Sequence, residues 1–212
     1  MGYLGRVAAA CALVATIAAS SAIAIASEKS SSTASSSPVR TRINIDNFGQ
    51  VNEHYYRGAQ PSGRDYADLA ALGVKTVIDL QRDGSPAEEG LVKAAGMTFH
   101  RIPMTTRAEP TREQLALFMK LVNDPANHPV YVHCAGGRHR TGVMTAIYRM
   151  TRDGWGAEQA FKEMKQYKFG ADFLHPEFKQ FVFAYHVQPE RTTPTVLATS
   201  VIAAQPAQAS AR

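Results

Sequence analysis

Apolar and polar positions form two kinds of pattern in the middle of the chain. Short runs rich in β-branched and aromatic residues predict strands, at residues 48–58, 74–80, 97–103 and 130–133. Longer stretches with a helical period predict helices, at residues 65–72, 86–95, 112–122, 141–153, 156–167 and 176–187. This alternation favours an α/β fold with a central, mostly parallel sheet flanked by helices. In such sheets, ligands bind beyond the carboxyl ends of the strands.

Residues typical of helix ends support these boundaries. Ser62 is a candidate N-cap for the first helix, and Gly73 and Gly96 are candidate stops for the first two helices. Thr111 and Gln114 have the spacing of a capping box in front of the third helix. The predicted helices are therefore separate elements and not parts of one long helix.

The first 26 residues differ from the rest of the chain. They hold one charge, Arg6, ahead of a long apolar run that ends in Ala24-Ile25-Ala26, a small-x-small cleavage pattern. This pattern predicts a secretory signal peptide cleaved after Ala26, and so a protein exported to a periplasm or secreted. An uncleaved membrane anchor is the alternative, because the apolar run is just long enough to span a bilayer.

Two further segments lie outside the predicted fold. Residues 27–39 are polar and Ser-rich and predict a flexible leader, and residues 188–212 are rich in Pro, Thr, Ala and Gln and predict a disordered tail. The folded domain is then residues 40–187.

Net charge and cysteine count narrow the possible partners and the redox chemistry. The net charge of +5 favours anionic partners, whether phosphate esters, nucleic acid or acidic lipid, or only a solvated basic surface. The chain has two cysteines, Cys11 and Cys134. Cleavage of the signal would remove Cys11, so the mature protein could form no internal disulfide.

The remaining cysteine lies in the densest cluster of reactive residues, VHCAGGRHRTG at residues 132–142. Cys134 ends a predicted strand and faces the start of the helix at Thr141. Backbone N–H groups between them can form an anion-binding nest, which Gly136 and Gly137 make conformationally accessible. Arg140 can bind two phosphate oxygens, and the helix dipole adds positive charge. This field favours the thiolate form of the cysteine.

A thiolate at the base of a phosphate cradle predicts attack on phosphorus, a phosphocysteine intermediate and hydrolysis by water. Thr141 is placed to hydrogen-bond the sulfur and help it leave, and His133 is placed to fix the loop.

Four other interpretations of this stretch are weaker. A nucleotide P-loop would need a Gly-Lys-Ser/Thr ending. A zinc site of His133, Cys134 and His139 would have a non-standard spacing. A rhodanese-like sulfur carrier and an inert loop are the others.

The stretch HCAGGRHRTG matches the H-C-x5-R-[ST]-G signature of the cysteine-dependent protein tyrosine phosphatases. Its late position in the domain resembles the dual-specificity group. A second stretch, YYRGAQPSGRDYADLAALGVKTVIDLQRD at residues 55–83, resembles the atypical dual-specificity phosphatases of bacteria, fungi and plants. The resemblance covers residues 47–183 and implies a dual-specificity phosphatase-like fold.

This resemblance also implies roles for single residues. Cys134 would be the nucleophile, and Arg140 would bind phosphate and stabilise the transition state. The residues that would line the phosphate loop are Ala135, Gly136, Gly137, Arg138 and His139. Arg138 and His139 would add positive charge to the loop, or would be solvated or folded back into structural hydrogen bonds. The family chemistry implies no metal and no cofactor.

The general acid is the point at which the chain departs from the family. The family places an Asp on the loop that corresponds to residues 104–111, where this chain has only Glu109. Glu109 is the first candidate, with a solvated loop residue as the alternative interpretation, and Asp83 is the second candidate.

The predicted activity is therefore hydrolysis of phosphate monoesters of the phosphotyrosine or dual-specificity type. Alternatives are an inositol polyphosphate or pyrophosphate phosphatase of the same chemistry, a pseudophosphatase that binds without turnover, and a sulfur-transfer protein. Expected partners are a phosphorylated protein or a small phosphorylated molecule. We expect no nucleic acid partner, and a membrane contact only through residues 1–26 if these stay uncleaved.

Overall fold

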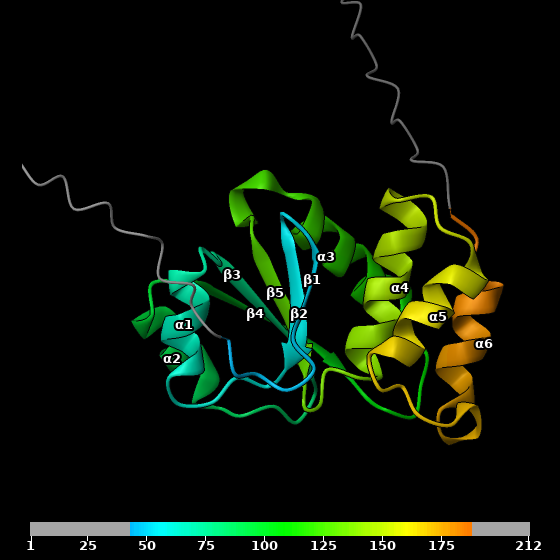
Figure 1. The fold of residues 1–212 in the computed structure, drawn as a ribbon, viewed down its shortest axis with the longest axis horizontal. Coiled ribbons are helices and arrows are strands. Elements are labelled where there is room, and N and C mark those ends of the chain that lie inside the picture. The colour runs from blue at the N-terminus through cyan, green and yellow to red at the C-terminus, as the bar shows by residue number, and fades with distance from the viewer. Residues whose placement is uncertain (1–42, 188–212) are drawn as a thin grey trace, which may run out of the picture. The chain divides into compact units, whose positions relative to one another are not determined.

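The computed structural model describes residues 43–187 (Figure 1). The predictions for the signal peptide, the leader and the tail lie outside these residues and stay predictions. Within the described part of the chain, no helix is long and apolar enough to cross a membrane. The described part is an α/β structure with a mostly parallel sheet flanked by helices, which confirms the predicted fold class.

The sheet has five strands in the order β1-β2-β5-β3-β4. Their bounds are β1 Gly49–Asn52, β2 Tyr55–Ala59, β3 Thr76–Gln81, β4 Thr98–Met104 and β5 Val130–Cys134. Only the β1–β2 pair is antiparallel. Strand β5 lies in the middle, between β2 and β3, and all of its residues are buried. Strand β5 is one residue longer than the strand expected at 130–133 and ends on Cys134.

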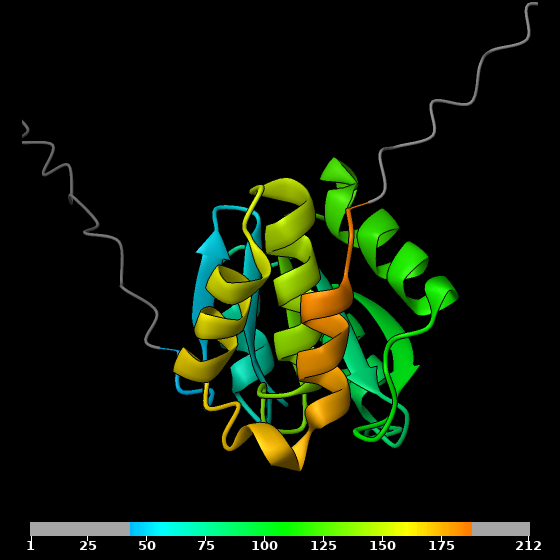
Figure 2. The same cartoon turned by 90° about the vertical axis from the view of Figure 1, so that its right-hand side faces the viewer.

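Helices cover both faces of the sheet (Figures 1 and 2). Their bounds are α1 Asp65–Ala71, α2 Glu88–Ala94, α3 Arg112–Asn123, α4 Arg140–Arg152, α5 Ala157–Gln166 and α6 Pro176–Ala184, with short 3-10 turns η1 Pro125–Asn127 and η2 Asp172–Leu174. Helices α1 and α2 lie on one face, and α3 to α6 lie on the other. Each face has its own buried apolar core, and burial of these two cores is the main stabilising contribution to the fold.

Most of the predicted helix ends are confirmed. Gly73 and Gly96 follow α1 and α2 with φ angles of +93° and +81°, which glycine adopts without steric cost. Thr111 and Gln114 form both hydrogen bonds of a capping box. The N-cap prediction for Ser62 is wrong, because Arg64 holds that position and the backbone N–H of Ser62 donates instead to the Asp65 carboxylate at 2.8 Å.

Candidate active site

Cys134 lies at the carboxyl edge of the sheet, at the end of its central strand. It pairs with Ala59 of β2 and is 3% exposed. Residues 135–139 form a tight loop from this point to the start of α4 at Arg140. The structure therefore brings the thiol, the loop and a helix N-terminus together, as the sequence predicts.

The carbonyl groups of this loop accept hydrogen bonds from the residue that follows β2 and from the segment before β1. The backbone N–H of Gln60 donates to the Ala135 carbonyl at 3.2 Å. The Asn47 amide donates to the carbonyls of Gly136 and Gly137, at 3.4 and 2.8 Å. Asn47 itself has a φ of +57°, a left-handed conformation that Asn tolerates better than most residues.

These contacts decide where the loop N–H groups point. In a planar trans peptide, the C=O of one residue and the N–H of the next point in opposite directions. With the carbonyls of residues 135–137 directed outward, the N–H groups of residues 136–138 point toward the inside of the loop. No hydrogen bond within the described residues uses these three N–H groups. They are therefore a nest that can bind an anion.

One of the two loop glycines is required by the geometry. Gly137 has a φ of +64°, and a Cβ atom there would collide with the backbone of Gly58 and Ala59. A Cβ atom on Gly136 would meet only the flexible Arg138 side chain, with its closest atom at 3.3 Å. The loop therefore packs directly against β2 at Gly137, and glycine is needed there more than at Gly136.

Arg140 lies at the first turn of α4 and is 6% exposed. Its Nη1 donates to the Met104 carbonyl at 3.3 Å and lies 3.6 Å from the Asp83 carboxylate. Its Nε has no hydrogen-bond partner among the described residues. The guanidinium thus lies between the loops that follow β3 and β4, and its free donor suits a phosphate oxygen.

Thr141 is fully buried beside Arg140. Its hydroxyl has no hydrogen-bond partner in the part of the chain that the structure describes. The hydrogen bond expected between Thr141 and the Cys134 sulfur is therefore not formed in this structure.

The side chain of His133 points to the opposite face of the sheet, into a buried charged network. Its Nε2 lies 2.9 Å from the Glu88 carboxylate and its Nδ1 lies 3.9 Å from that of Asp79. The shorter contact has the distance of an ion pair without the alignment of a hydrogen bond. Arg101 contacts both carboxylates, at 2.8 Å for Asp79 and 3.7 Å for Glu88. His133 thus anchors the strand just before the nucleophile.

The same network has the only grouping of metal-ligand type found within the described residues. Asp79, Glu88 and His133 place one ligand atom each within 4.8 Å of one another. Arg101, however, already supplies a positive charge to both carboxylates. A buried carboxylate that is paired with a guanidinium has less need of a metal ion.

The two charged side chains of the loop differ in their surroundings. Arg138 is half-exposed, with Nη2 3.6 Å from the Asp46 carboxylate. His139 turns away from the loop interior: its Nε2 donates to the Phe169 carbonyl at 2.9 Å and its ring packs on His175. Burial lowers the pKa of His139 below its ordinary value, so its ring is neutral at pH 7. The positive charge expected from His139 is therefore absent, and its side chain has a structural role.

The two candidate general acids lie differently with respect to Arg140. Glu109 is exposed, and its side chain makes no hydrogen bond or ion pair with other described residues. Asp83 is also exposed, but its carboxylate lies 3.6 Å from Arg140. The second candidate is thus the carboxylate that the fold brings to the site.

Two residues of the site were missed in the sequence. Asn47 and Arg57 both bind the Gly137 carbonyl, at 2.8 and 3.0 Å. Arg57 belongs to the stretch YYRGAQP, which carried the family resemblance but suggested no role for it. Both contacts join residues at least 80 positions apart, so no local pattern could have found them.

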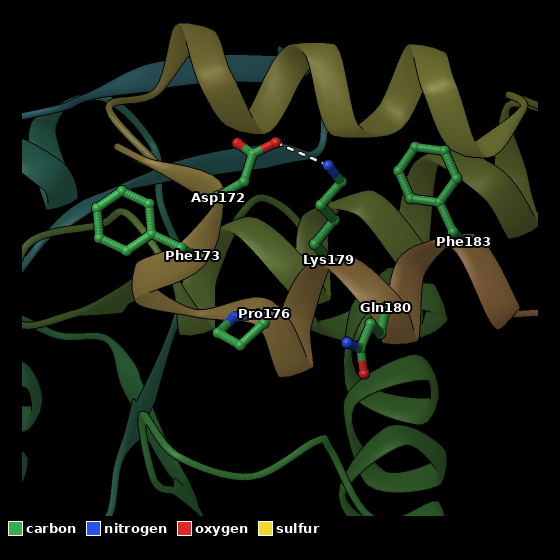
Figure 3. Close-up of a pocket in the computed structure, with 6 residues that line it drawn as sticks. All are labelled: Asp172, Phe173, Pro176, Lys179, Gln180 and Phe183. Atoms are coloured by element: carbon green, nitrogen blue, oxygen red, sulfur yellow. Dashed lines mark hydrogen bonds and ion pairs between the residues drawn. The ribbon is translucent and has the colours of Figure 1, made fainter.

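A separate apolar hollow lies beside η2 and α6 (Figure 3). Its lining consists of Asp172, Phe173, Pro176, Lys179, Gln180 and Phe183. The hollow contains no residue of the loop and no thiol, so it is separate from the candidate site at the edge of the sheet.

Comparison with known proteins places this geometry in a family. Residues 29–180 match the family model described as "DSP-PTPase phosphatase fused to NAD+ kinase". The chain is 31% identical, over 124 residues, to the dual specificity protein phosphatase TpbA of Pseudomonas aeruginosa, and the match covers 58% of this chain and 56% of TpbA. It is 27% identical, over 130 residues, to an inositol diphosphatase of Saccharomyces cerevisiae, covering 58% of this chain and 46% of that protein. The chain thus spans about half the length of these two relatives.

A solved structure supports the same relationship. The crystal structure of a cysteine-to-serine variant of P. aeruginosa TpbA in complex with phosphotyrosine matches with a TM-score of 0.56 and 27% identity. The match covers 65% of this chain and 83% of the TpbA chain. The dual-specificity phosphatase-like fold predicted from the sequence is thereby confirmed.

Proposed function

Because this chain belongs to the DSP-PTPase phosphatase family, we propose that it hydrolyses phosphate monoesters through a phosphocysteine intermediate on Cys134. One observation carries the proposal. The Cys134 thiol lies at the base of a loop whose N–H groups at residues 136–138 are unused among the described residues, and the loop leads to the buried Arg140, whose Nε also lacks a partner there. That arrangement suits the three non-bridging oxygens of a phosphoryl group.

The reaction proceeds in two balanced steps. The Cys134 thiolate attacks phosphorus, the S–P bond forms, and the ester P–O bond breaks as the leaving oxygen takes a proton. Water then attacks phosphorus, breaks the S–P bond and releases inorganic phosphate and the thiolate. In both steps the loop N–H groups and Arg140 hold the equatorial oxygens, where negative charge lies in the transition state. We propose Asp83 as the proton donor, ahead of Glu109, because of its position beside Arg140.

The substrate class is a monoester with a good leaving group. Proton donation matters most when the leaving oxygen is basic, as in alkyl phosphates. Residues 104–111 contain no Asp, and the proposed donor Asp83 is highly exposed, so proton donation should be weak and aryl phosphates such as phosphotyrosine should react faster than phosphoserine. The TpbA complex with phosphotyrosine supports this class by analogy. Rates on phosphotyrosine and phosphoserine peptides of the same sequence test the preference, and equal rates would exclude it.

An inositol pyrophosphate is the second candidate substrate. The yeast relative is named an inositol diphosphatase, and a phosphoanhydride also leaves without strong protonation. Two cations at the loop rim, Arg138 and Lys168, share the single carboxylate of Asp46, which leaves net positive charge for a multiply charged substrate. Parallel kcat/KM measurements on an inositol pyrophosphate and on a phosphotyrosine peptide decide between the two.

Export belongs to the same proposal but rests on the sequence alone. Cleavage after Ala26 would deliver a protein whose only cysteine is the nucleophile. N-terminal sequencing of the protein from a periplasmic or culture fraction tests this. An intact N-terminus in a membrane fraction would favour the anchor.

The activity itself has a direct test. Hydrolysis of para-nitrophenyl phosphate is measured with EDTA and a reductant, for the parent and for Cys134→Ser. We expect turnover by the parent and none by the variant. An inactive parent that still binds orthovanadate would instead be the pseudophosphatase of the alternative hypothesis, and thiosulfate sulfurtransferase activity would identify a sulfur carrier.

A further inference from the structure

Arg57 of β2 is a fully buried arginine underneath the phosphate loop. Its exposed fraction is 0%, and its Nη2 donates to the Gly137 carbonyl at 3.0 Å. The flat guanidinium stacks on the Tyr167 ring, 3.9 Å from its centroid. Its Nε and Nη1 have no hydrogen-bond partner among the described residues. A buried charge with two free donors is costly, so a purely structural role leaves this residue unexplained.

A partly buried arginine shows what a structural role looks like in this fold. Arg149 of α4 also stacks on an aromatic ring, 4.4 Å from the centroid of Trp155. Unlike Arg57, it is neutralised by carboxylates, with Glu163 at 2.8 Å and Asp153 at 2.7 Å. Within the described residues, no carboxylate forms an ion pair with Arg57. Its positive charge is therefore available to an anion of another kind.

The active-site cysteine lies on the strand next to that of Arg57. Arg57 pairs with Val132 of β5, and Ala59, two residues on, pairs with Cys134. Burial lowers the pKa of Arg57, and the charges of Tyr55, Glu163, Tyr167 and Cys134 oppose that shift. Glu163 is already bound to Arg149. The Arg57 guanidinium is therefore left without a counter-ion among the described residues, at the point where it contacts the phosphate loop.

We propose that Arg57 is a positioning residue of the phosphate site. It holds the Gly137 carbonyl outward, so that the N–H of Arg138 points at the bound phosphoryl group. Its unneutralised charge also favours the anionic phosphoryl group bound in the loop. The proposal rests on the proposed function and adds a second arginine, from β2, to the one in the signature.

Only arginine meets both requirements at this position. The guanidinium lies flat on Tyr167 while one of its nitrogens reaches Gly137. A lysine ammonium would keep the charge but could not stack as a plane and donate in the same geometry. Arg57→Lys should therefore separate the charge from the geometry, and Arg57→Met should remove both.

The test measures orthovanadate affinity by calorimetry together with kcat and KM on para-nitrophenyl phosphate. For Arg57→Met we expect vanadate affinity and kcat to fall about 100-fold, with KM changing much less. The reason is that the N–H of Arg138 would lose its orientation toward the phosphoryl group, where negative charge develops. Arg57→Lys should lose about 10-fold, since the charge remains. Arg149→Met is the matched control. It loses a stacked, partly buried cation and stability, but vanadate affinity should stay within about twofold of the parent.

Each outcome decides the proposal. If Arg57→Met folds and keeps vanadate affinity and kcat within about twofold of the parent, the proposal is wrong. It is also wrong if Arg149→Met loses vanadate affinity to the same degree. Should Arg57→Met not fold, Arg57→Lys decides alone, and unchanged vanadate affinity in that variant excludes the role. Vanadate binding needs no turnover, so an inactive parent whose vanadate affinity still depends on Arg57 would overturn the proposed function and leave this inference standing.

Discussion

The charged groups that flank Cys134 are arranged differently on the two faces of the sheet. On the face of α1 and α2, Asp79 and Glu88 are matched by Arg101 next to His133. On the face of α3 to α6, beneath and beside the loop, Arg57 has no carboxylate partner among the described residues, and the one described carboxylate that forms an ion pair with Arg140 is the highly exposed Asp83. The first arrangement is a closed network, and the second is open to an anion from outside.

This difference separates structural charge from functional charge. A buried network whose charges compensate one another holds elements in place, and removing one member costs stability. Cations left without a buried counter-ion are stabilised only when an anion arrives, so their removal costs binding. Changes to the loop or to these two arginines should therefore alter phosphate chemistry, whereas changes to the network around Asp79 and Glu88 should alter folding.

The largest effect should come from the loop side, at Gly137. In Gly137→Ala, the new methyl group would have to adopt a φ of +64° and would collide with the backbone of Gly58. We expect kcat on para-nitrophenyl phosphate to fall at least about 100-fold, because the loop N–H groups lose their alignment. Gly136→Ala is the matched control and should keep kcat within about fivefold. Equal losses in the two variants would show that the contact with β2 does not shape the loop.

The second effect should appear on the opposite face, at Arg101. Arg101→Met leaves Asp79 and Glu88 buried without their guanidinium, so we expect the free energy of unfolding to fall by about 3 kcal/mol. Orthovanadate affinity of the folded fraction should change little. Urea denaturation and calorimetry on one sample check both quantities. A large loss of vanadate affinity with unchanged stability would contradict the division between the faces.

A smaller effect should distinguish the two candidate acids. Asp83→Asn should lower kcat on an alkyl phosphate about 10-fold or more, and on an aryl phosphate much less, since general acids contribute mainly to poor leaving groups. Glu109→Gln should change neither rate by more than about twofold, because its side chain makes no hydrogen bond or ion pair with other described residues. The reverse pattern would make Glu109 the acid.

The smallest effect concerns pH and His139. Burial holds the pKa of His139 in the folded protein below its unfolded value of 6.5. As the pH falls through about 6.5, the unfolded chain binds a proton that the folded chain does not, so the stability of the fold decreases. In His139→Gln, the free energy of unfolding should therefore drop less than in the parent between pH 7.5 and 5.5. Parallel urea titrations at the two pH values test this, and an identical pH dependence in both proteins would show that His139 is not responsible.

Much of the fold could be predicted because the signals are local. Hydrophobic periodicity located the strands and helices, and Gly73, Gly96 and the Thr111–Gln114 pair marked helix ends correctly. Ser62 was assigned wrongly, because it and Asp65 compete for the same helix start and the Asp65 carboxylate binds the backbone N–H of Ser62. Two polar residues so close together allow alternatives that a pattern cannot rank.

In the candidate site, too, the local features could be predicted and the contacts between distant segments could not. Cys134 and Arg140 belong to one motif of seven residues. The sequence alone was therefore enough to identify the thiol, the loop and the nearby arginine as the candidate site. Asn47, Arg57 and Asp83 reach the loop from segments more than fifty positions away. Only the tertiary structure shows that these three residues lie at the site. It also shows that the His139 side chain forms a structural hydrogen bond with the Phe169 carbonyl. The physical reason is that phosphate recognition depends on the direction of backbone dipoles and on unneutralised charge, and both are set by contacts that exist only after the chain has folded.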